Sequence, residues 1–298
     1  SMVWNTVTES PLNAVASFVK NRTLSANGML YVFGEHADGT THVVATTAEA
    51  PNFDESSSVQ AANGEKMDVR SIQYLKGNFY ALAGGHVVKS AQAAGTWHNT
   101  EATQTFTAMV GTSTDSLFAI SGGQIWASAD GANWKRCTLD TEGALPTQNI
   151  TASNIAARNN KNNEVMIMVG QDAENKVSVW KHDINLKGDF SYPWILLPQT
   201  DELKGYTCPQ LKDASLFAYD GNTVLAGISA DGSVAPFYVS EDNGRTWKTS
   251  LLYNPTPQGA TSLSVTVDAN HFVWMVCGGT GKVLKGRLNR LGNELNAQ

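Results

Sequence analysis

Short stretches of alternating apolar and polar residues recur along this chain of 298 residues. Three regions, residues 78–97, 116–134 and 223–247, show the same order of features. In each, a first stretch ends in Gly, a second ends in Ser, a tight polar turn follows, and a Trp opens a third stretch. Alternation with a period of two, bounded by turn residues, is typical of strands with one buried face. The pattern therefore predicts a repeated unit of antiparallel strands.

The glycine that ends the first of these stretches can be followed through the whole chain. It recurs six times, as Gly34, Gly84, Gly122, Gly170, Gly227 and Gly278. An apolar strand is expected ahead of each glycine, at residues 14–19, 69–75, 106–111, 153–157, 215–219 and 263–267. Six units of four strands match a radial β-propeller better than a sandwich or two domains. The predicted fold is all-β, a six-bladed β-propeller with four-stranded blades, and a seven-bladed ring is the alternative.

An aromatic residue follows the turn in the first five units only, as Phe53, Trp97, Trp134, Trp194 and Trp247. The sixth aromatic appears at the other end of the chain, where the sequence around Trp4 resembles that around Trp97. The outermost strand of a blade comes last in sequence, so residues 2–8 are expected to complete the last blade, whose other strands come from residues 261–288. Such sharing closes the ring without a covalent bond and suppresses splaying of the repeat array.

The domain expected from this repeat is a single propeller over residues 2–290, followed by a tail at 291–298. Its blades are predicted at residues 10–53, 54–97, 98–134, 135–194, 195–247, and 248–290 together with 2–9.

Two turns between third and fourth strands have nearly the same sequence. They contain Ser128, Asp130, Gly131 and Trp134 in one blade and Ser240, Asp242, Gly244 and Trp247 in another. A Ser and an Asp two residues apart place short oxygens where they can accept backbone N–H groups across a tight turn, and Gly adopts the positive φ. The Trp can pack between blades. These eight residues are therefore predicted to be structural.

The two turns resemble the Asp-box, the Ser-x-Asp-x-Gly-x-x-Trp turn of bacterial neuraminidase repeats found in sialidases, sortilin-type receptors and photosystem assembly factors. In that family the turns are structural and lie on the face away from the binding site. The resemblance implies that Asp130 and Asp242 neither catalyse a reaction nor bind Ca²⁺. In texture and blade sequence the chain is also similar to six-bladed propellers of unknown function in exported lipoproteins of gut anaerobes.

Charge and cysteine content narrow the function. Charged residues make up 16% of the chain and the net charge is −6, with the basic residues scattered. Binding to nucleic acid is not expected, because it requires clustered Lys and Arg. No apolar stretch is long enough to span a membrane. Cys137, Cys208 and Cys277 lack the spacing of a zinc site, and Cys277 is expected to be a buried free thiol, so neither a metal nor a cofactor is predicted.

Low charge and a texture rich in Ser, Thr, Asn, Gly and Ala are common among exported bacterial β-proteins. Together with the resemblance, they predict a protein of the periplasm or cell surface, anchored through a lipidated segment ahead of Ser1. We expect a monomer whose partner is a glycan or a protein.

Binding residues are expected on the face opposite the Ser/Asp turns, where second-to-third turns and blade-to-blade connections surround the central channel. Residues near the start of an innermost strand, in the connection before it, or just after a recurring glycine are the candidates. They are Asp68, Arg70, His86, Tyr206, Lys212 and Asp213.

Sialidase activity is not predicted, because three arginines would have to hold the substrate carboxylate. Arg22 and Arg158 are expected at the far ends of first strands, which leaves Arg70 alone well placed. Motifs of other enzyme classes are lacking from the sequence. The predicted function is therefore a non-catalytic binding or scaffolding module for a glycan or a protein surface. The alternative is a glycoside hydrolase in which Asp68 and Asp213 form the carboxylate pair.

Overall fold

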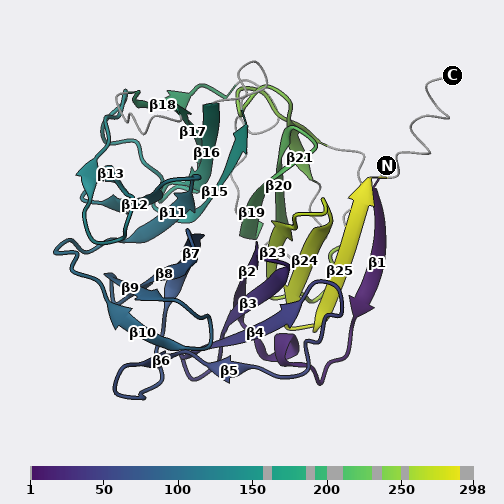
Figure 1. Ribbon diagram of the computed structural model, residues 1–298. Coiled ribbons are helices and arrows are strands. Elements are labelled where there is room, and N and C mark those ends of the chain that lie inside the picture. Colours follow the sequence, from purple (N-terminus) through teal and green to yellow (C-terminus); the bar gives the residue numbers. More distant parts are fainter. Residues whose placement is uncertain are drawn as a thin grey trace, which may run out of the picture.

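Six antiparallel sheets surround a common centre in the computed structural model (Figure 1). The structure describes residues 2–156, 163–185, 192–199, 211–229, 237–249 and 255–288. Each sheet is one blade. The innermost strand comes first in sequence among the four main strands of a blade, except that the N-terminal strand of the chain is the outermost strand of the last blade. The prediction of an all-β, six-bladed propeller is confirmed.

The first three blades are built from consecutive strands. Blade 1 contains β2 (Lys20–Ala26), β3 (Met29–Glu35), β4 (Thr41–Thr47) and β5 (Ser57–Ser58). Blade 2 contains β7 (Arg70–Leu75), β8 (Asn78–Ala83), β9 (His86–Ser90) and β10 (Thr96–Asn99), with β6 (Gln60–Ala61) added in parallel to β10. Blade 3 contains β11 (Ala108–Thr112), β12 (Leu117–Ser121), β13 (Gln124–Ser128) and β14 (Lys135–Arg136).

The other three blades follow the same order, and the last is completed by the N-terminus. Blade 4 contains β15 (Gln148–Ala156), β16 (Asn163–Gln171), β17 (Val177–Asn185) and β18 (Trp194–Leu197). Blade 5 contains β19 (Leu211–Tyr219), β20 (Asn222–Ser229), β21 (Tyr238–Ser240) and β22 (Lys248–Thr249). Blade 6 contains β23 (Ser262–Val267), β24 (Val273–Gly278), β25 (Lys282–Leu288) and β1 (Met2–Thr8).

The N-terminal strand closes the ring as the sequence predicts. β1 pairs antiparallel with β25, with Trp4 opposite Gly286 and Met2 opposite Leu288. A Cβ at Gly286 would lie 2.6 Å from the Trp4 ring, so the glycine leaves the space that the indole occupies.

The hydrophobic core is divided into six clusters, one between each pair of neighbouring blades. The recurring aromatic residue of every blade packs in the cluster shared with the preceding blade. These residues are Phe53, Trp97, Trp134, Trp194, Trp247 and, against the cluster of blades 5 and 6, Trp4. Apolar strand faces are thus covered by neighbouring sheets, which accounts for the low content of charged residues.

The innermost strand predicted for blade 1, residues 14–19, is wrong. Ala14–Ser17 forms the 3₁₀-helix η1, and β2 begins only at Lys20. Val15 and Phe18 are apolar because both are fully buried between blades 6 and 1. This displacement changes the expected position of Arg22, which lies close to the start of its strand.

Two cysteines, Cys137 and Cys277, are buried free thiols. Burial raises the pKa of each to about 12, so both are protonated and inert at neutral pH. The prediction for Cys277 is confirmed, whereas Cys208 lies outside the described residues. Within the described parts of the chain, no helix is long and apolar enough to cross a membrane.

Candidate functional site

A pocket of about 370 Å³ lies at the centre of the ring, between the innermost strands. Every blade contributes to its lining, for example through Arg22, Gln73, Val110, Thr151, Ser215 and Ser264. The pocket opens at the end of the blades where innermost strands begin and second strands end. In blade 1 this end is marked by Lys20 at the start of β2, Glu35 at the end of β3 and Thr41 at the start of β4, which pair in register and line the pocket. This is the end of the blades on which the sequence analysis placed the binding face.

Short polar side chains connect the innermost strands around much of the pocket. The backbone N–H of Thr23 donates to Ser264 Oγ at 2.7 Å, that of Val265 to Ser215 Oγ at 3.1 Å, and that of Leu216 to Thr151 Oγ1 at 2.9 Å. An innermost strand is the edge of its sheet, so the N–H groups that point away from the sheet need partners outside the blade. Hydroxyl groups of the neighbouring blade supply them, and the channel wall is fixed in place.

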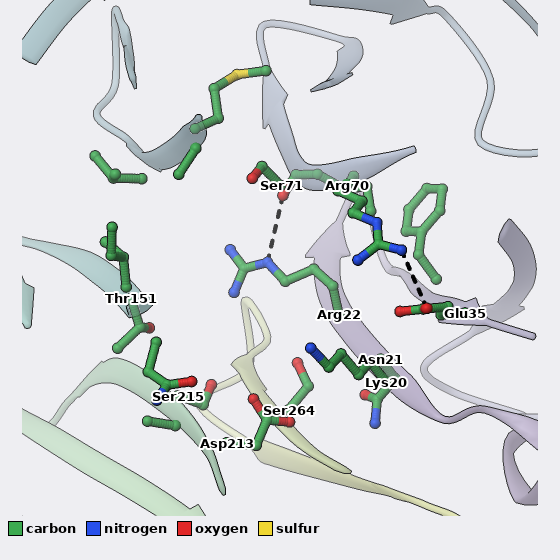
Figure 2. Close-up of a pocket in the computed structure, with 18 of the residues that line it drawn as sticks. Lys20, Asn21, Arg22, Glu35, Arg70, Ser71, Thr151, Asp213, Ser215 and Ser264 are labelled. Carbon is green, nitrogen blue, oxygen red and sulfur yellow. Dashed lines mark hydrogen bonds and ion pairs between the residues drawn. The ribbon is translucent and has the colours of Figure 1, made fainter. Parts of the chain in front are cut away.

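Arg22 reaches into the middle of the pocket, between the Arg70–Glu35 pair and the side that carries Thr151, Ser215 and Asp213 (Figure 2). Its Nε donates to the backbone oxygen of Ile72, 3.4 Å away in blade 2. Burial lowers the pKa of Arg22. The expectation that Arg22 lies at the far end of its strand is therefore wrong.

Arg70 lies at the pocket rim and is already paired with two acids. Its Nε lies 3.1 Å from Asp68 Oδ1 in the same blade, and its Nη2 lies 3.2 Å from Glu35 Oε1 in blade 1. Hydrogen bonding to Asp68, with the charge of Glu35, raises the pKa of Arg70. Both Asp68 and Arg70 line the pocket, so the structure brings these two candidates together.

Asp213 lines the pocket from blade 5, and its Oδ2 accepts the backbone N–H of Leu263 in blade 6 at 3.0 Å. Desolvation raises the pKa of Asp213 to about 6, against the opposing effects of this hydrogen bond and of the Lys20 charge. Asp213 thus links two blades and has a pKa raised to about 6.

The remaining candidates lie away from the pocket or outside the described part of the structure. His86 begins β9, is exposed, and is not among the residues that line the pocket. Tyr206 and Arg158 lie outside the described residues. Lys212 belongs to β19, but its side chain is outside the described part of the structure.

Sequence reasoning missed several residues of the pocket, including the charged residues Arg22 and Glu35. Glu35 comes directly after the recurring Gly34, a position that the same reasoning marked as important. Arg22 was detectable from the turn Asn27-Gly28, because such a dipeptide is a strong hairpin signal and places a strand immediately before it.

The first Ser/Asp turn, residues 128–134, lies at the opposite end of the blades, where β13 leads into β14. Ser128 Oγ accepts the N–H of Gly131 at 2.8 Å, and Asp130 Oδ1 accepts the N–H groups of Ala132 and Asn133 at 2.9 and 2.8 Å. Trp134 Nε1 donates to Gly131 O at 2.9 Å. These contacts hold the pKa of Asp130 at about 2.

The second Ser/Asp turn, residues 240–247, repeats this arrangement. Ser240 Oγ accepts the N–H of Gly244 at 2.8 Å, Asp242 Oδ1 accepts that of Thr246 at 2.9 Å, and Trp247 Nε1 donates to Gly244 O at 2.9 Å. Gly131 and Gly244 have φ of 75° and 88°, a region that favours glycine.

Metal binding has no candidate among the described residues, where no three His, Cys, Asp or Glu side chains are placed to share one ion. The pocket instead offers hydroxyl, amide, carboxylate and guanidinium groups, which suit hydrogen bonding to a polar ligand.

Solved structures with a similar fold differ in what they bind. The SapL1 lectin in complex with alpha methyl fucoside is 11% identical, with a TM-score of 0.52 over 89% of this chain and 90% of the lectin chain. BBS1N in complex with ARL6DN is 12% identical, with a TM-score of 0.50 over 97% of each chain. The alpha-L-arabinofuranosidase CtGH43 from Clostridium thermocellum ATCC 27405 is 13% identical, with a TM-score of 0.45 over 86% of this chain and 80% of its own. At such identities the likeness concerns the fold alone.

The comparison with curated proteins returned no match. A sequence-family model, in contrast, matches residues 1–296, which is nearly the whole ring together with its closing strand. The chain therefore belongs to the DUF6242 beta propeller domain family.

Proposed function

We propose that this propeller is a non-catalytic binding module that holds a glycan at the mouth of its central channel. The observation that carries the proposal is the pocket of about 370 Å³, to which all six blades contribute. Its size falls within the range of small-molecule sites, which begins at about 300 Å³. A sugar hydroxyl both donates and accepts hydrogen bonds, as do the side chains that line this pocket.

The acids of the pocket support binding rather than catalysis. Glycoside hydrolysis needs one carboxylate that donates a proton and another that acts as base or nucleophile. Here Asp68 and Glu35 are paired with Arg70, and Asp213 accepts a backbone N–H. Their hydrogen-bonding capacity is largely directed at the protein itself.

Hydrogen bonding, more than ring stacking, would hold the sugar. Among the described residues that line the pocket, Phe33 alone is aromatic, and its side chain is buried between blades 1 and 2 and does not offer a ring for stacking. A lectin solved with alpha methyl fucoside has a similar fold, which supports a sugar as the ligand. A protein surface is the rival ligand, and a glycan array separates the two.

A glycan array with purified protein tests the proposal, using a pair of matched variants. Ala108→Trp adds a large side chain at a residue that lines the pocket, and Ala129→Trp adds the same side chain to an exposed turn on the opposite face. We expect glycan retention in the wild type and in Ala129→Trp, and its loss in Ala108→Trp. Retention that survives Ala108→Trp contradicts a channel site. Co-purification of a protein partner without glycan retention favours the scaffolding role.

A glycoside hydrolase remains the second candidate, because Asp213 has a pKa of about 6 and lines a pocket, as a general acid would. In that reaction Asp213 would protonate the leaving oxygen, and Asp68 would be the second carboxylate. If the protein hydrolyses a chromogenic glycoside and Asp213→Asn abolishes this activity, the protein is a glycoside hydrolase and not a binding module. Glycan retention without turnover supports the binding module.

The proposal also includes what the sequence resemblance implies about location and turn type. The two Ser/Asp turns are treated as Asp-boxes. The protein is treated as exported, lipid-anchored and monomeric, with a single propeller domain. Fractionation of cells that express the full gene product, with metabolic labelling by a radioactive fatty acid, tests the anchor. Light scattering of the purified domain tests the monomer.

A further inference from the structure

We propose that Arg22 binds a carboxylate of the ligand, so that the glycan held in the channel is an acidic one that carries a uronic acid. This inference rests on the proposed glycan-binding function and adds the chemical class of the sugar. It starts from the guanidinium group that extends into the centre of the pocket (Figure 2).

The guanidinium of Arg22 has donors to spare. Its Nε is directed at the oxygen of Ile72, 3.4 Å away, which leaves the two Nη groups for the channel. Among the described residues no carboxylate lies within ion-pair distance of Arg22, whereas Arg70 at the rim has two such partners. The two arginines of one pocket therefore differ in that only Arg22 lacks a counterion from the described chain.

An unpaired charge in this position is costly for the protein. Burial disfavours the charged form, as the lowered pKa of Arg22 indicates. An arginine nevertheless stays protonated in proteins, so the cost cannot be avoided by loss of the proton. A ligand anion within reach of both Nη groups would compensate for it.

The surroundings favour a carboxylate over a doubly charged phosphate. Glu35, Asp68 and Asp213 line the same pocket, and they would repel a dianion more strongly than a monoanion. A planar carboxylate can also accept two parallel N–H bonds from one guanidinium, which adds geometric selectivity. At about 370 Å³ the pocket suits a sugar ring at the end of an oligosaccharide.

The test measures binding of trigalacturonate and of its fully methyl-esterified form by isothermal titration calorimetry. The two probes share the sugar and differ in the carboxylate charge. For the wild type we expect the acid to bind at least about tenfold more tightly than the ester, the effect of one charge-assisted hydrogen-bonded pair. Trigalactose with a 6-sulfate on its terminal residue, as a third probe, distinguishes a sulfate from a carboxylate.

Variants locate the charge preference at Arg22. Arg22→Gln should reduce the ratio between acid and ester to about one, and Arg22→Lys should leave a smaller preference, because an ammonium cannot form the two parallel bonds. Lys76→Gln removes a positive charge from an exposed ion pair with Asp115, away from the pocket, and should keep the full ratio. Melting curves establish that each variant is folded.

Each outcome decides something. Equal binding of acid and ester by the wild type overturns the inference but leaves the glycan-binding function standing. A preference that persists in Arg22→Gln overturns the role of Arg22. Stronger binding of the sulfated sugar than of trigalacturonate overturns the carboxylate. If the glycan array retains other sugars and no acidic sugar, the inference fails alone, and if it retains none, the proposed function fails with it.

Discussion

The two ends of the blades use the same types of polar residue in opposite ways. At the turn end, Ser128 and Asp130 direct their oxygens at backbone N–H groups of their own turn. At the channel end, the Nη groups of Arg22 have no described carboxylate as a partner, and Asp213 has a pKa of about 6. Asp130 at the turn end therefore stabilises the fold, whereas Arg22 at the channel end keeps hydrogen-bond donors that no described carboxylate uses.

The difference shows what separates a structural polar residue from a candidate binding residue. Asp130 has a strongly lowered pKa because several donors stabilise its charge. Asp213 has a raised pKa because desolvation outweighs its backbone hydrogen bonds and the charge of Lys20. Residue type is the same in both cases. Burial is what distinguishes them, because Asp130 is exposed and Asp213 is desolvated. Substitutions at the two ends of the blades should therefore have different effects.

The largest effect is expected at the turn end, from Trp134→Ala. Trp134 is 8% exposed, packs against Phe106 with ring centroids 4.5 Å apart, and donates to Gly131 O. Removal of the indole leaves a cavity between blades 2 and 3 and should cost about 3–5 kcal/mol of unfolding free energy, measured by urea denaturation. Trp134→Phe keeps most of the packing and should cost clearly less. Equal losses in the two variants would mean that the indole hydrogen bond, and not packing, fixes the turn.

A change of opposite sign is expected at the channel end, from Asp213→Asn. The pKa of Asp213 is raised to about 6, so its ionisation opposes folding, and wild-type stability from this group is lost as the pH rises from about 4 to about 6. Asparagine still accepts the N–H of Leu263 but cannot ionise. The variant should therefore gain on the wild type by up to about 3 kcal/mol between pH 4 and pH 7. Urea denaturation of both proteins at several pH values measures this gain. If the unfolding free energies of the wild type and the variant change in parallel with pH, the desolvation of Asp213 that the structure indicates is contradicted.

A smaller loss is expected from Asp130→Ala at the turn end. The substitution removes the acceptor for the N–H groups of Ala132 and Asn133 and should cost about 1–2 kcal/mol at pH 7, comparable to the loss of a helix N-cap. Because the pKa of Asp130 is lowered to about 2, its charge contributes stability above pH 4, and that contribution is lost as the pH falls through 2. Urea denaturation at pH 7 and at pH 2 measures both. Asp130→Asn, which keeps an acceptor oxygen, should lose less, and a loss equal to that of the alanine variant would assign the effect to charge alone.

Most of the fold was predictable because its determinants are local and repeat. Each recurring glycine lies among the last three residues of a strand or directly after it, and each recurring aromatic packs against the preceding blade, so a pattern found in three regions extends to six. The exception, residues 14–19, shows the limit of this reasoning. Val15 and Phe18 are apolar for contacts with blade 6, which is distant in sequence, and such contacts do not require a strand.

The site was less predictable because its residues meet only when the ring closes. Asp68, Arg70 and Asp213 were found from their positions at the start of innermost strands or just before them, and all three line the pocket. Arg22 was misplaced by the error in the first strand. Pairing of Arg70 with Glu35 across two blades depends on how the sheets pack, for which a single sequence contains no local signal.

The smallest effect is expected from Arg70→Gln, which tests whether the rim of the channel contributes to the fold. The side chain of Arg70 is 55% exposed, and exposed ion pairs contribute roughly 0–1 kcal/mol, so loss of its pairs with Asp68 and Glu35 should change the unfolding free energy by less than about 1 kcal/mol. The difference should shrink further at high ionic strength, because salt screens exposed charges. Urea denaturation at low salt and in 1 M NaCl measures both. A loss above 2 kcal/mol, insensitive to salt, would mean that the ion pairs at the channel end stabilise the ring as the Ser/Asp turns do, and the contrast between the two ends would no longer hold.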